Sequence, residues 1–271
     1  MRGMYTAGVL DCLSDWGVEF PLVASSSSSA LIGSYYVSRQ RGQIYEAYRY
    51  LAKNYSLVSF RRMITHKELF QMDLLFKLLP EKLFPFDFQT FVKSGAKLLV
   101  STTDIQSGSA VYHDSFPSLE SLFTLVRASS SLPVLAHSVA FEGRVLLDGG
   151  VADPIPIKPS IERGYRKNVV ILTRNTGYIK KPSYLGWLYR RLFRNYPALI
   201  ELLQNRHEVY NQTIRNIQEM SRDGTAFLIR PQKPLIAGRI ERNRRVLEDL
   251  YRQGYAEMEQ NKEALFRFLN Q

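Results

Sequence analysis

Short, continuously apolar segments alternate with longer helical patterns along most of the chain, and this alternation limits the fold more than any other feature. The apolar segments lie at residues 20–24, 96–104, 144–150, 168–174 and 225–231. The helical patterns cover residues 3–16, 30–38, much of 43–95, 118–129, 184–221 and 240–270. Apolar strands without polar alternation are typical of a sheet that is buried on both faces. The sequence therefore predicts an α/β fold in three layers, with a mainly parallel central sheet and helices on both of its faces.

Nothing in the spacing of these segments resembles a linker, so we expect residues 1–271 to form a single domain. Residues 1–178 would form its core. Residues 179–271 would form a mostly helical extension, whose late strand at 225–231 returns to the sheet.

Composition limits the classes of protein to which the chain can belong. Hydrophobic residues make up 45% of its 271 residues, which is enough for a full core. A single cysteine, Cys12, excludes an internal disulfide and a cysteine-based metal site. The N-terminal residues do not have the pattern of a signal peptide, and no apolar run is long enough to span a membrane. We therefore expect a cytoplasmic protein. The net charge of +11 suits contact with anionic lipid, whereas no nucleic-acid-binding motif accompanies it.

The stretch VASSSSSALIG, residues 23–33, places five serines where a predicted strand leads into a predicted helix. A strand, a very tight turn and a helix form a nucleophile elbow, which usually reads G-x-S-x-G. The N–H groups at the start of the helix favour the negative charge that develops during acyl transfer. A polar linker between the strand and the helix is the alternative interpretation.

Four stretches of the chain resemble the patatin-like phospholipases, in the bacterial branch that has a C-terminal helical extension. They are MRGMYTAGVLDCL, VASSSSSALIG, RASSSLPVLAHSVAFEGRVLLDGGVADPIPI, and IRPQKPL followed by LYRQGY. The second falls at the family's elbow, and the third is similar to the segment that carries its D-G-G/A motif. The resemblance covers nearly the whole chain and implies the three-layer patatin-like fold.

This resemblance assigns roles to individual residues. With ALIG at 30–33 aligned behind the elbow, Ser27 takes the position of the nucleophile, and Asp148 becomes the base of a Ser–Asp dyad. Ser25 and Ser29 stand where the family has glycines, and Gly149 and Gly150 form the turn after the acid.

Arg2 and Gly3 match the end of the family's glycine-rich loop, which with Ser28 would support the oxyanion. The resemblance implies a lipid acyl-ester hydrolase that acts on a phospholipid or another lipid ester through an acyl-enzyme, without a metal or an organic cofactor.

Two departures from the family pattern leave alternatives open. The strand and the three glycines that precede Arg2 in the family are not in this sequence, and serines replace the two elbow glycines. A catalytically silent protein of the same fold that binds lipid surfaces is therefore the second interpretation. The third is an α/β-hydrolase-type esterase with Ser27, Asp148 and His207, because His207 is the histidine that follows the acid in the chain. His66, His113 and His137 precede the acid and are expected to be ordinary packing or surface residues.

Residues 184–194, YLGWLYRRLFR, combine aromatic and leucine side chains with Arg190, Arg191 and Arg194. A basic, aromatic amphipathic helix suits a lipid–water interface. This stretch predicts peripheral contact with the membrane surface. The alternative is a helix packed on the core with a charged outer face.

Overall fold

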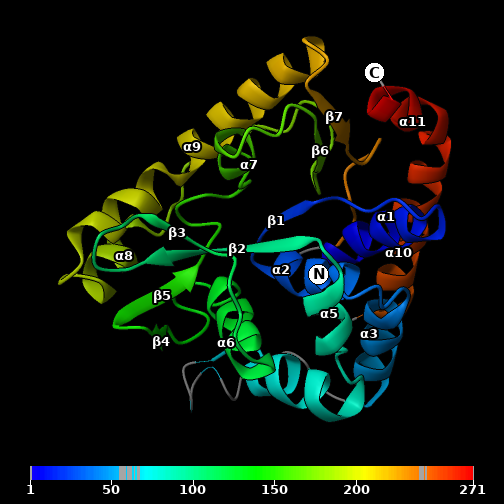
Figure 1. Ribbon diagram of the computed structural model, residues 1–271. Helices are drawn as coiled ribbons and strands as arrows, with labels where there is room; N and C mark the ends of the chain where they lie inside the picture. The colour runs from blue at the N-terminus through cyan, green and yellow to red at the C-terminus, as the bar shows by residue number, and fades with distance from the viewer. Residues whose placement is uncertain are drawn as a thin grey trace.

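The computed structural model describes residues 2–54, 59, 63, 65, 68–237, 241 and 243–270. Its strands are β1 (Leu22–Ser26), β2 (Lys97–Asp104), β3 (Ala110–His113), β4 (Val139–Phe141), β5 (Arg144–Asp148), β6 (Asn168–Ile171) and β7 (Ala226–Ile229). The first five form one sheet, in which β1, β2, β5 and β4 are neighbours and β3 pairs with β2, whereas β6 and β7 pair with each other (Figure 1). All five predicted strand segments are therefore present.

The predicted α/β architecture is confirmed, but the strand pairing is mixed rather than mainly parallel. β1 pairs with β2, and β6 with β7, in parallel. The other pairs, β2–β3, β2–β5 and β4–β5, are antiparallel. Short turns cause part of this difference, because β2–β3 and β4–β5 are hairpins whose connections are too short for a parallel crossover. Neither β3 nor β4 was predicted.

The helices follow the predicted segments closely. They are α1 (Gly3–Asp15), α2 (Ser28–Val37), α3 (Gln43–Asn54), the π-helix η1 (Leu74–Leu83), α5 (Phe88–Lys93), α6 (Leu119–Ser129), α7 (Lys158–Glu162), α8 (Gly186–Leu192), α9 (Pro197–Arg222), α10 (Arg244–Gln260) and α11 (Lys262–Asn270). Ser118 caps α6 as expected, and its hydroxyl accepts a hydrogen bond from Ser121 N–H. Part of the predicted helical range 43–95, at residues 55–58, 60–62, 64 and 66–67, lies outside the described residues.

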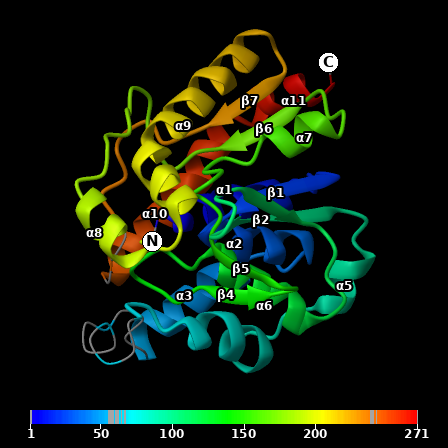
Figure 2. The same ribbon diagram turned by 90° about the vertical axis from the view of Figure 1, so that its left-hand side faces the viewer.

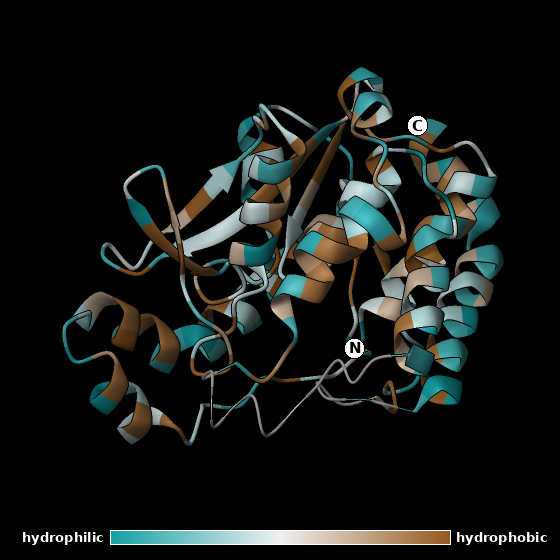
Figure 3. Cartoon of the chain, turned by 90° about the horizontal axis from the view of Figure 1, so that it is seen from below, coloured by the Kyte–Doolittle hydropathy of each residue, from teal (hydrophilic) through white to brown (hydrophobic). Residues whose placement is uncertain are grey.

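Helices cover both faces of the main sheet, as the alternation of side chains along β5 shows. Leu146 packs into the large core cluster with residues of α1, α2 and α6, while its neighbour Leu147 packs with Leu199 and Leu203 of α9. Figure 2 shows the strands between these two helical layers. The helices are banded with hydrophobic and hydrophilic residues, as amphipathic covering helices require (Figure 3).

The first helix, α1, packs against α10 in the C-terminal region. The helices approach so closely that a Cβ on Gly254 would lie 2.1 Å from the carbonyl oxygen of Tyr5. Two side-chain hydrogen bonds flank this crossing, from Tyr5 Oη to Glu257 (2.8 Å) and from Tyr251 Oη to Asp11 (2.7 Å). The crossing therefore ties the C-terminal helices to the first helix of the chain.

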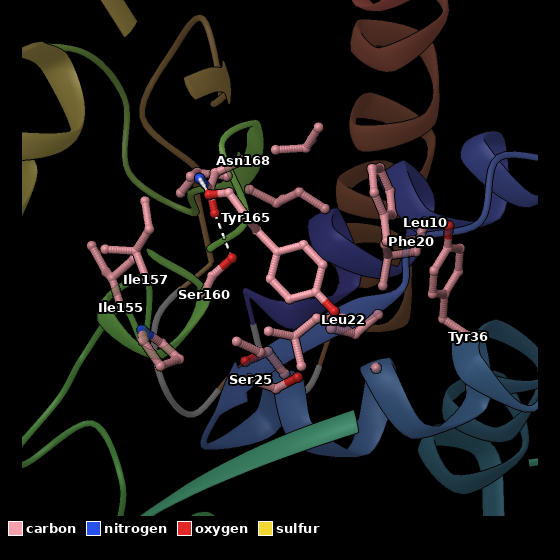
Figure 4. A pocket seen from close by; sticks show the side chains of 18 of the residues that line it. Leu10, Phe20, Leu22, Ser25, Tyr36, Ile155, Ile157, Ser160, Tyr165 and Asn168 are labelled. Carbon is pink, nitrogen blue, oxygen red and sulfur yellow. Dashed lines mark hydrogen bonds between the residues drawn. The ribbon is translucent and has the colours of Figure 1, made fainter. Parts of the chain in front are cut away.

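A cavity of about 230 Å³ separates β1 from β6. Figure 4 shows its lining, which includes Leu10, Phe20 and Leu22 near β1, and Ile155 and Ile157 ahead of β6. We expected the late strand at 225–231 to return to the main sheet, and this expectation is corrected. β7 pairs only with β6 among the described strands, because no described strand bridges the space between β6 and β1.

Candidate active site

The serine run forms a sharp turn between β1 and α2, as the sequence predicted. Ser27 lies between the two elements with φ 61° and ψ −137°, a backbone conformation that residues other than glycine rarely adopt. Such a conformation costs on the order of 1–3 kcal/mol and persists only where its surroundings enforce it. The turn places the Ser27 side chain at the N-terminus of α2.

A buried serine from another element holds this strained turn. Ser129, the last residue of α6, accepts a hydrogen bond from Ser27 N–H (2.8 Å) through its hydroxyl, and it donates to the carbonyl oxygen of Ser101 in β2 (2.7 Å). Its side chain is fully buried. Ser129 thus joins the elbow to the sheet, a role that the sequence analysis did not assign to it. The serine run in RASSS, residues 127–131, was the sequence feature that could have pointed to Ser129.

The serines that replace the family's glycines fit without backbone strain. Neither Ser25 nor Ser29 is among the residues with positive φ. The Ser25 hydroxyl lies 2.8 Å from the position that a Cβ on Gly33 would occupy, so the missing side chain of Gly33 makes room for it. The Ser29 hydroxyl donates to Ser26 O (2.6 Å) and accepts from Ser26 N–H (3.0 Å). The Ser29 hydroxyl therefore stabilises the turn.

Asp148 ends β5 and meets the elbow from the other side. Its Oδ2 accepts a hydrogen bond of 2.6 Å from Ser27 Oγ, and its Oδ1 accepts one of 2.9 Å from Gly150 N–H. The side chain is fully buried, which excludes water from competing for these bonds. The structure thus brings together the two residues that the resemblance paired, 121 positions apart in the chain.

The turn after Asp148 needs glycine because it lies directly against β2. A Cβ on Gly149 would lie 2.0 Å from the carbonyl oxygen of Ser101. Thr103 of β2 fixes the same turn, since its hydroxyl donates to Asp148 O (2.8 Å) and accepts from Ala152 N–H (3.1 Å). Close packing, rather than an unusual backbone angle, therefore explains this glycine.

The start of α1 lies beside the elbow. A Cβ on Gly3 would lie 3.4 Å from Ser28 Oγ, which places the backbone at Gly3 next to the first turn of α2. The Arg2 side chain donates from Nε to Ala237 O (3.1 Å), so it also contacts the C-terminal region. Gly3 and Ser28 therefore lie together at the start of α2, whereas Arg2 makes its side-chain contact with Ala237.

One residue near the dyad comes from α9 and was not predicted. Arg206 Nε donates a hydrogen bond to Gly150 O, the carbonyl of the residue whose N–H binds Asp148. Its Nη2 lies 3.1 Å from the position that a Cβ on Gly150 would occupy, and Asp148 Oδ1 lies 3.0 Å from the same position. A guanidinium nitrogen of Arg206 is therefore within about 6 Å of a carboxylate oxygen of Asp148. Nothing in the sequence around Arg206 predicts a contact with a residue 56 positions away.

His207 and His113 contact residues other than Ser27 and Asp148, although His113 contacts Thr102, which lies opposite Asp148 in the sheet. His207 Nδ1 lies 3.0 Å from Gln204 O within its own helix, and its Nε2 lies 3.7 Å from Glu208. His113 Nε2 lies 2.9 Å from the hydroxyl of Thr102. Burial lowers the pKa of His113 to about 4, so it is neutral near pH 7. His66 lies outside the described residues.

Within the described part of the chain, no group of three or more histidine, cysteine, aspartate or glutamate side chains is placed to hold a metal ion. Among the helices described, none combines the length and the apolar character needed to cross a bilayer.

Comparison with known proteins agrees with this geometry. Residues 1–161 match the family described as patatin-like phospholipase, and residues 196–270 match a domain of unknown function, DUF6363. A relative in Escherichia coli (strain K12), the uncharacterized protein YjjU, is 27% identical over 241 residues. The match covers 86% of this chain and 66% of the relative, just under two thirds of the relative's length.

Proposed function

Since this chain belongs to the patatin-like phospholipase family, whose match takes in both Ser27 and Asp148, we propose that it hydrolyses lipid acyl esters with these two residues as a catalytic dyad. The observation that carries the proposal is the 2.6 Å hydrogen bond from Ser27 Oγ to Asp148 Oδ2 at a strained strand–turn–helix junction. A nucleophile within hydrogen-bond reach of a base is the arrangement that acyl transfer requires.

The proposed reaction follows from the direction of this bond. Asp148 accepts the proton of Ser27 Oγ as the oxygen attacks the ester carbonyl, and the carbonyl electrons move to its oxygen. Collapse of the tetrahedral intermediate forms the acyl-enzyme and expels the alcohol, which takes the proton from Asp148. Water then attacks the acyl group, Asp148 accepts a proton from this water, and that proton returns to Ser27 as the fatty acid leaves.

The developing oxyanion has suitable donors near the elbow. The first N–H groups of a helix have no acceptor within the helix, and Ser28 occupies that position in α2. The backbone at Gly3 lies beside it. Donors at such positions typically contribute a factor of about 10²–10³ to the rate.

The proposal is tested with a fluorophosphonate probe, which reacts with activated serines. Wild-type protein should be labelled, and peptide mapping should find the adduct on Ser27. Ser27→Ala should lose both labelling and hydrolysis of a fluorogenic lipid ester, and Asp148→Asn should keep the fold but lose turnover. Labelling that persists in Ser27→Ala, or full turnover in Asp148→Asn, would contradict the dyad.

We also propose that α8 and the residues before it contact the membrane surface. Tyr184 is 89% exposed, Trp187 is 62% exposed and Leu192 is 51% exposed, while Tyr189 and Phe193 pack against the core. Arg190 and Arg191 lie exposed on the same short helix. Exposed aromatic and aliphatic side chains among cations favour an anionic lipid surface.

Sedimentation with vesicles tests this contact. Wild-type protein should bind vesicles that contain phosphatidylglycerol more strongly than neutral vesicles, and Trp187→Ala should weaken the binding. Exposed Val92 lies on α5, far along the chain from α8, so Val92→Ala is a control for the loss of an exposed apolar side chain. Equal binding by all three proteins would refute the contact.

The single-domain organisation of residues 1–271 also remains a proposal. The α1–α10 crossing and the bond from Arg206 to Gly150 support it, because both join the C-terminal region to the residues that carry the dyad. A single cooperative unfolding transition, seen alike by calorimetry and circular dichroism, is the expected result.

A further inference from the structure

A second cavity, of about 290 Å³, lies between the segments that follow β6 and β7 and the middle of α9. These elements adjoin one another in Figure 1. Its polar lining includes Arg174 after β6, Arg230 after β7, and Tyr210 and Arg215 on α9. Neither the proposed reaction nor the proposed membrane contact uses this cavity.

The charged residues that line the cavity are all cationic. None of the described residues that line the cavity is an aspartate or a glutamate. Within the described part of the chain, neither Arg174 nor Arg230 forms an ion pair, whereas Arg127 and Arg163 elsewhere are paired with carboxylates. Partly buried arginines without a carboxylate partner favour an anion from solution.

The positions of these cations are fixed by their surroundings. The guanidinium of Arg174 lies over the ring of Tyr178, 4.0 Å from its centroid, and this ring meets that of Tyr210 edge to face. Asn211 secures the same loop, because its side chain accepts from Lys180 N–H (2.9 Å) and donates to Lys180 O (3.0 Å). A preorganised site loses less entropy when a ligand binds.

Tyr210 is exposed to the positive charge of several arginines. Burial raises the pKa of the Tyr210 hydroxyl, and the positive charges of Arg174, Arg2 and Arg230 oppose that rise. Arg2 precedes Gly3, whose backbone lies beside the elbow.

We infer that this cavity is a binding site for a phosphate or phosphate-ester anion. Guanidinium groups bind phosphate oxygens through paired, charge-assisted hydrogen bonds, and a tyrosine hydroxyl supplies a further donor. The volume is that of a small ligand site, sufficient for a phosphate that carries a glycerol group. The anion can come from a phospholipid headgroup or from a soluble phosphate compound, and the experiment distinguishes these sources.

The test is titration calorimetry at fixed ionic strength, in the Ser27→Ala background so that no ligand is hydrolysed. The ligands are inorganic phosphate, glycerol 3-phosphate, dihexanoylphosphatidylglycerol below its micelle concentration, and dihexanoylglycerol as the uncharged comparison. Arg174→Gln and Arg230→Gln each remove one cation from the cavity. Arg222→Gln removes an equal charge from the exposed end of α9 and is the matched control.

We expect saturable binding of the phosphate ligands, with a loss of affinity of at least about 10-fold in Arg174→Gln and Arg230→Gln, whereas any binding of dihexanoylglycerol should be the same in these variants as in their parent. Arg222→Gln should change the affinity by less than about 2-fold. Phosphatidylglycerol that binds at least 10-fold more tightly than glycerol 3-phosphate identifies a headgroup subsite. Similar affinities identify a site for a soluble phosphate compound.

Absence of saturable anion binding would overturn the inference. Wild-type affinity in both Arg174→Gln and Arg230→Gln would also overturn it. An equal loss of affinity in Arg222→Gln would do the same, because it would show only a general effect of charge. Circular dichroism verifies that each variant is folded. Because the titration needs no turnover, failure of the proposed dyad leaves this result interpretable.

Discussion

The hydroxyl of Ser129 offers a sharp test of how the elbow is held. Ser129→Ala removes two hydrogen bonds, from Ser27 N–H and to Ser101 O, in surroundings where the side chain is fully buried. A buried polar group left without a partner costs about 1–3 kcal/mol, and water can reach the two groups only in part. We therefore expect the variant to lose about 2–4 kcal/mol of unfolding free energy. The unrestrained turn should also lower kcat/KM by about 10–100-fold, since small displacements of a nucleophile have effects of this size.

The neighbouring residue provides the matched control. Ser130 Oγ is buried but has no hydrogen-bond partner among the described residues, so Ser130→Ala deletes the same atom type without breaking a bond. We expect its unfolding free energy to change by less than about 0.5 kcal/mol, and its activity to stay at the wild-type level. Urea denaturation of both variants, followed by hydrolysis of a fluorogenic lipid ester, gives the comparison. Equal stability of the two variants would refute the reasoning about the elbow.

Three other predictions follow from the packing and the charges. Gly254→Ala should destabilise the protein by at least about 2 kcal/mol in urea denaturation, because the new Cβ meets the backbone of α1. Gly186→Ala in α8 should be tolerated, because its Cβ would make an ordinary contact, 3.7 Å from Gln204 Nε2. Burial lowers the pKa of His113 to about 4 in the folded state, against about 6.5 when unfolded. The stability that this difference contributes is therefore present above pH 6.5 and is lost as the pH falls towards 4; in His113→Gln, the pH dependence of the melting temperature in this window should weaken. Arg206→Gln should lower kcat/KM by about 10-fold, because the turn at Gly150 that positions Asp148 loses a hydrogen bond, while Arg222→Gln at the exposed end of the same helix should leave kcat/KM unchanged.

The sequence predicted the elements whose residues are apolar because they are buried. β2, at Lys97–Asp104, is buried at seven of its eight positions and is an unbroken run of aliphatic and small polar residues. In contrast, β4 has only three residues and none of them is buried, so its short apolar run is not long enough to predict a strand. Hairpin pairing, which makes the sheet mixed, depends on turns such as Glu142–Gly143, which have positive φ, and these are hard to distinguish from loops.

The residues of the candidate site also differ in whether the sequence alone could locate them. Ser27 and Asp148 could be located because each lies in a stretch that resembles a known family. The residues that hold them in place were not located: Ser129 stands in the serine run RASSS, which does not identify its partner, and Arg206 carries no local pattern. The effect of Ser25 and Ser29 was also beyond the sequence, because it depends on the space beside Gly33 and on the direction of one hydroxyl.

The space between β1 and β6 affects which parts of the molecule unfold locally. In the described structure, β6 and β7 share backbone hydrogen bonds with each other but with no strand of the larger sheet, so no strand ladder couples the two sheets. Cooperative units of this kind can unfold separately. Backbone amides of β6 and β7 should therefore exchange with deuterium as one group, ahead of the amides shared by β1 and β2.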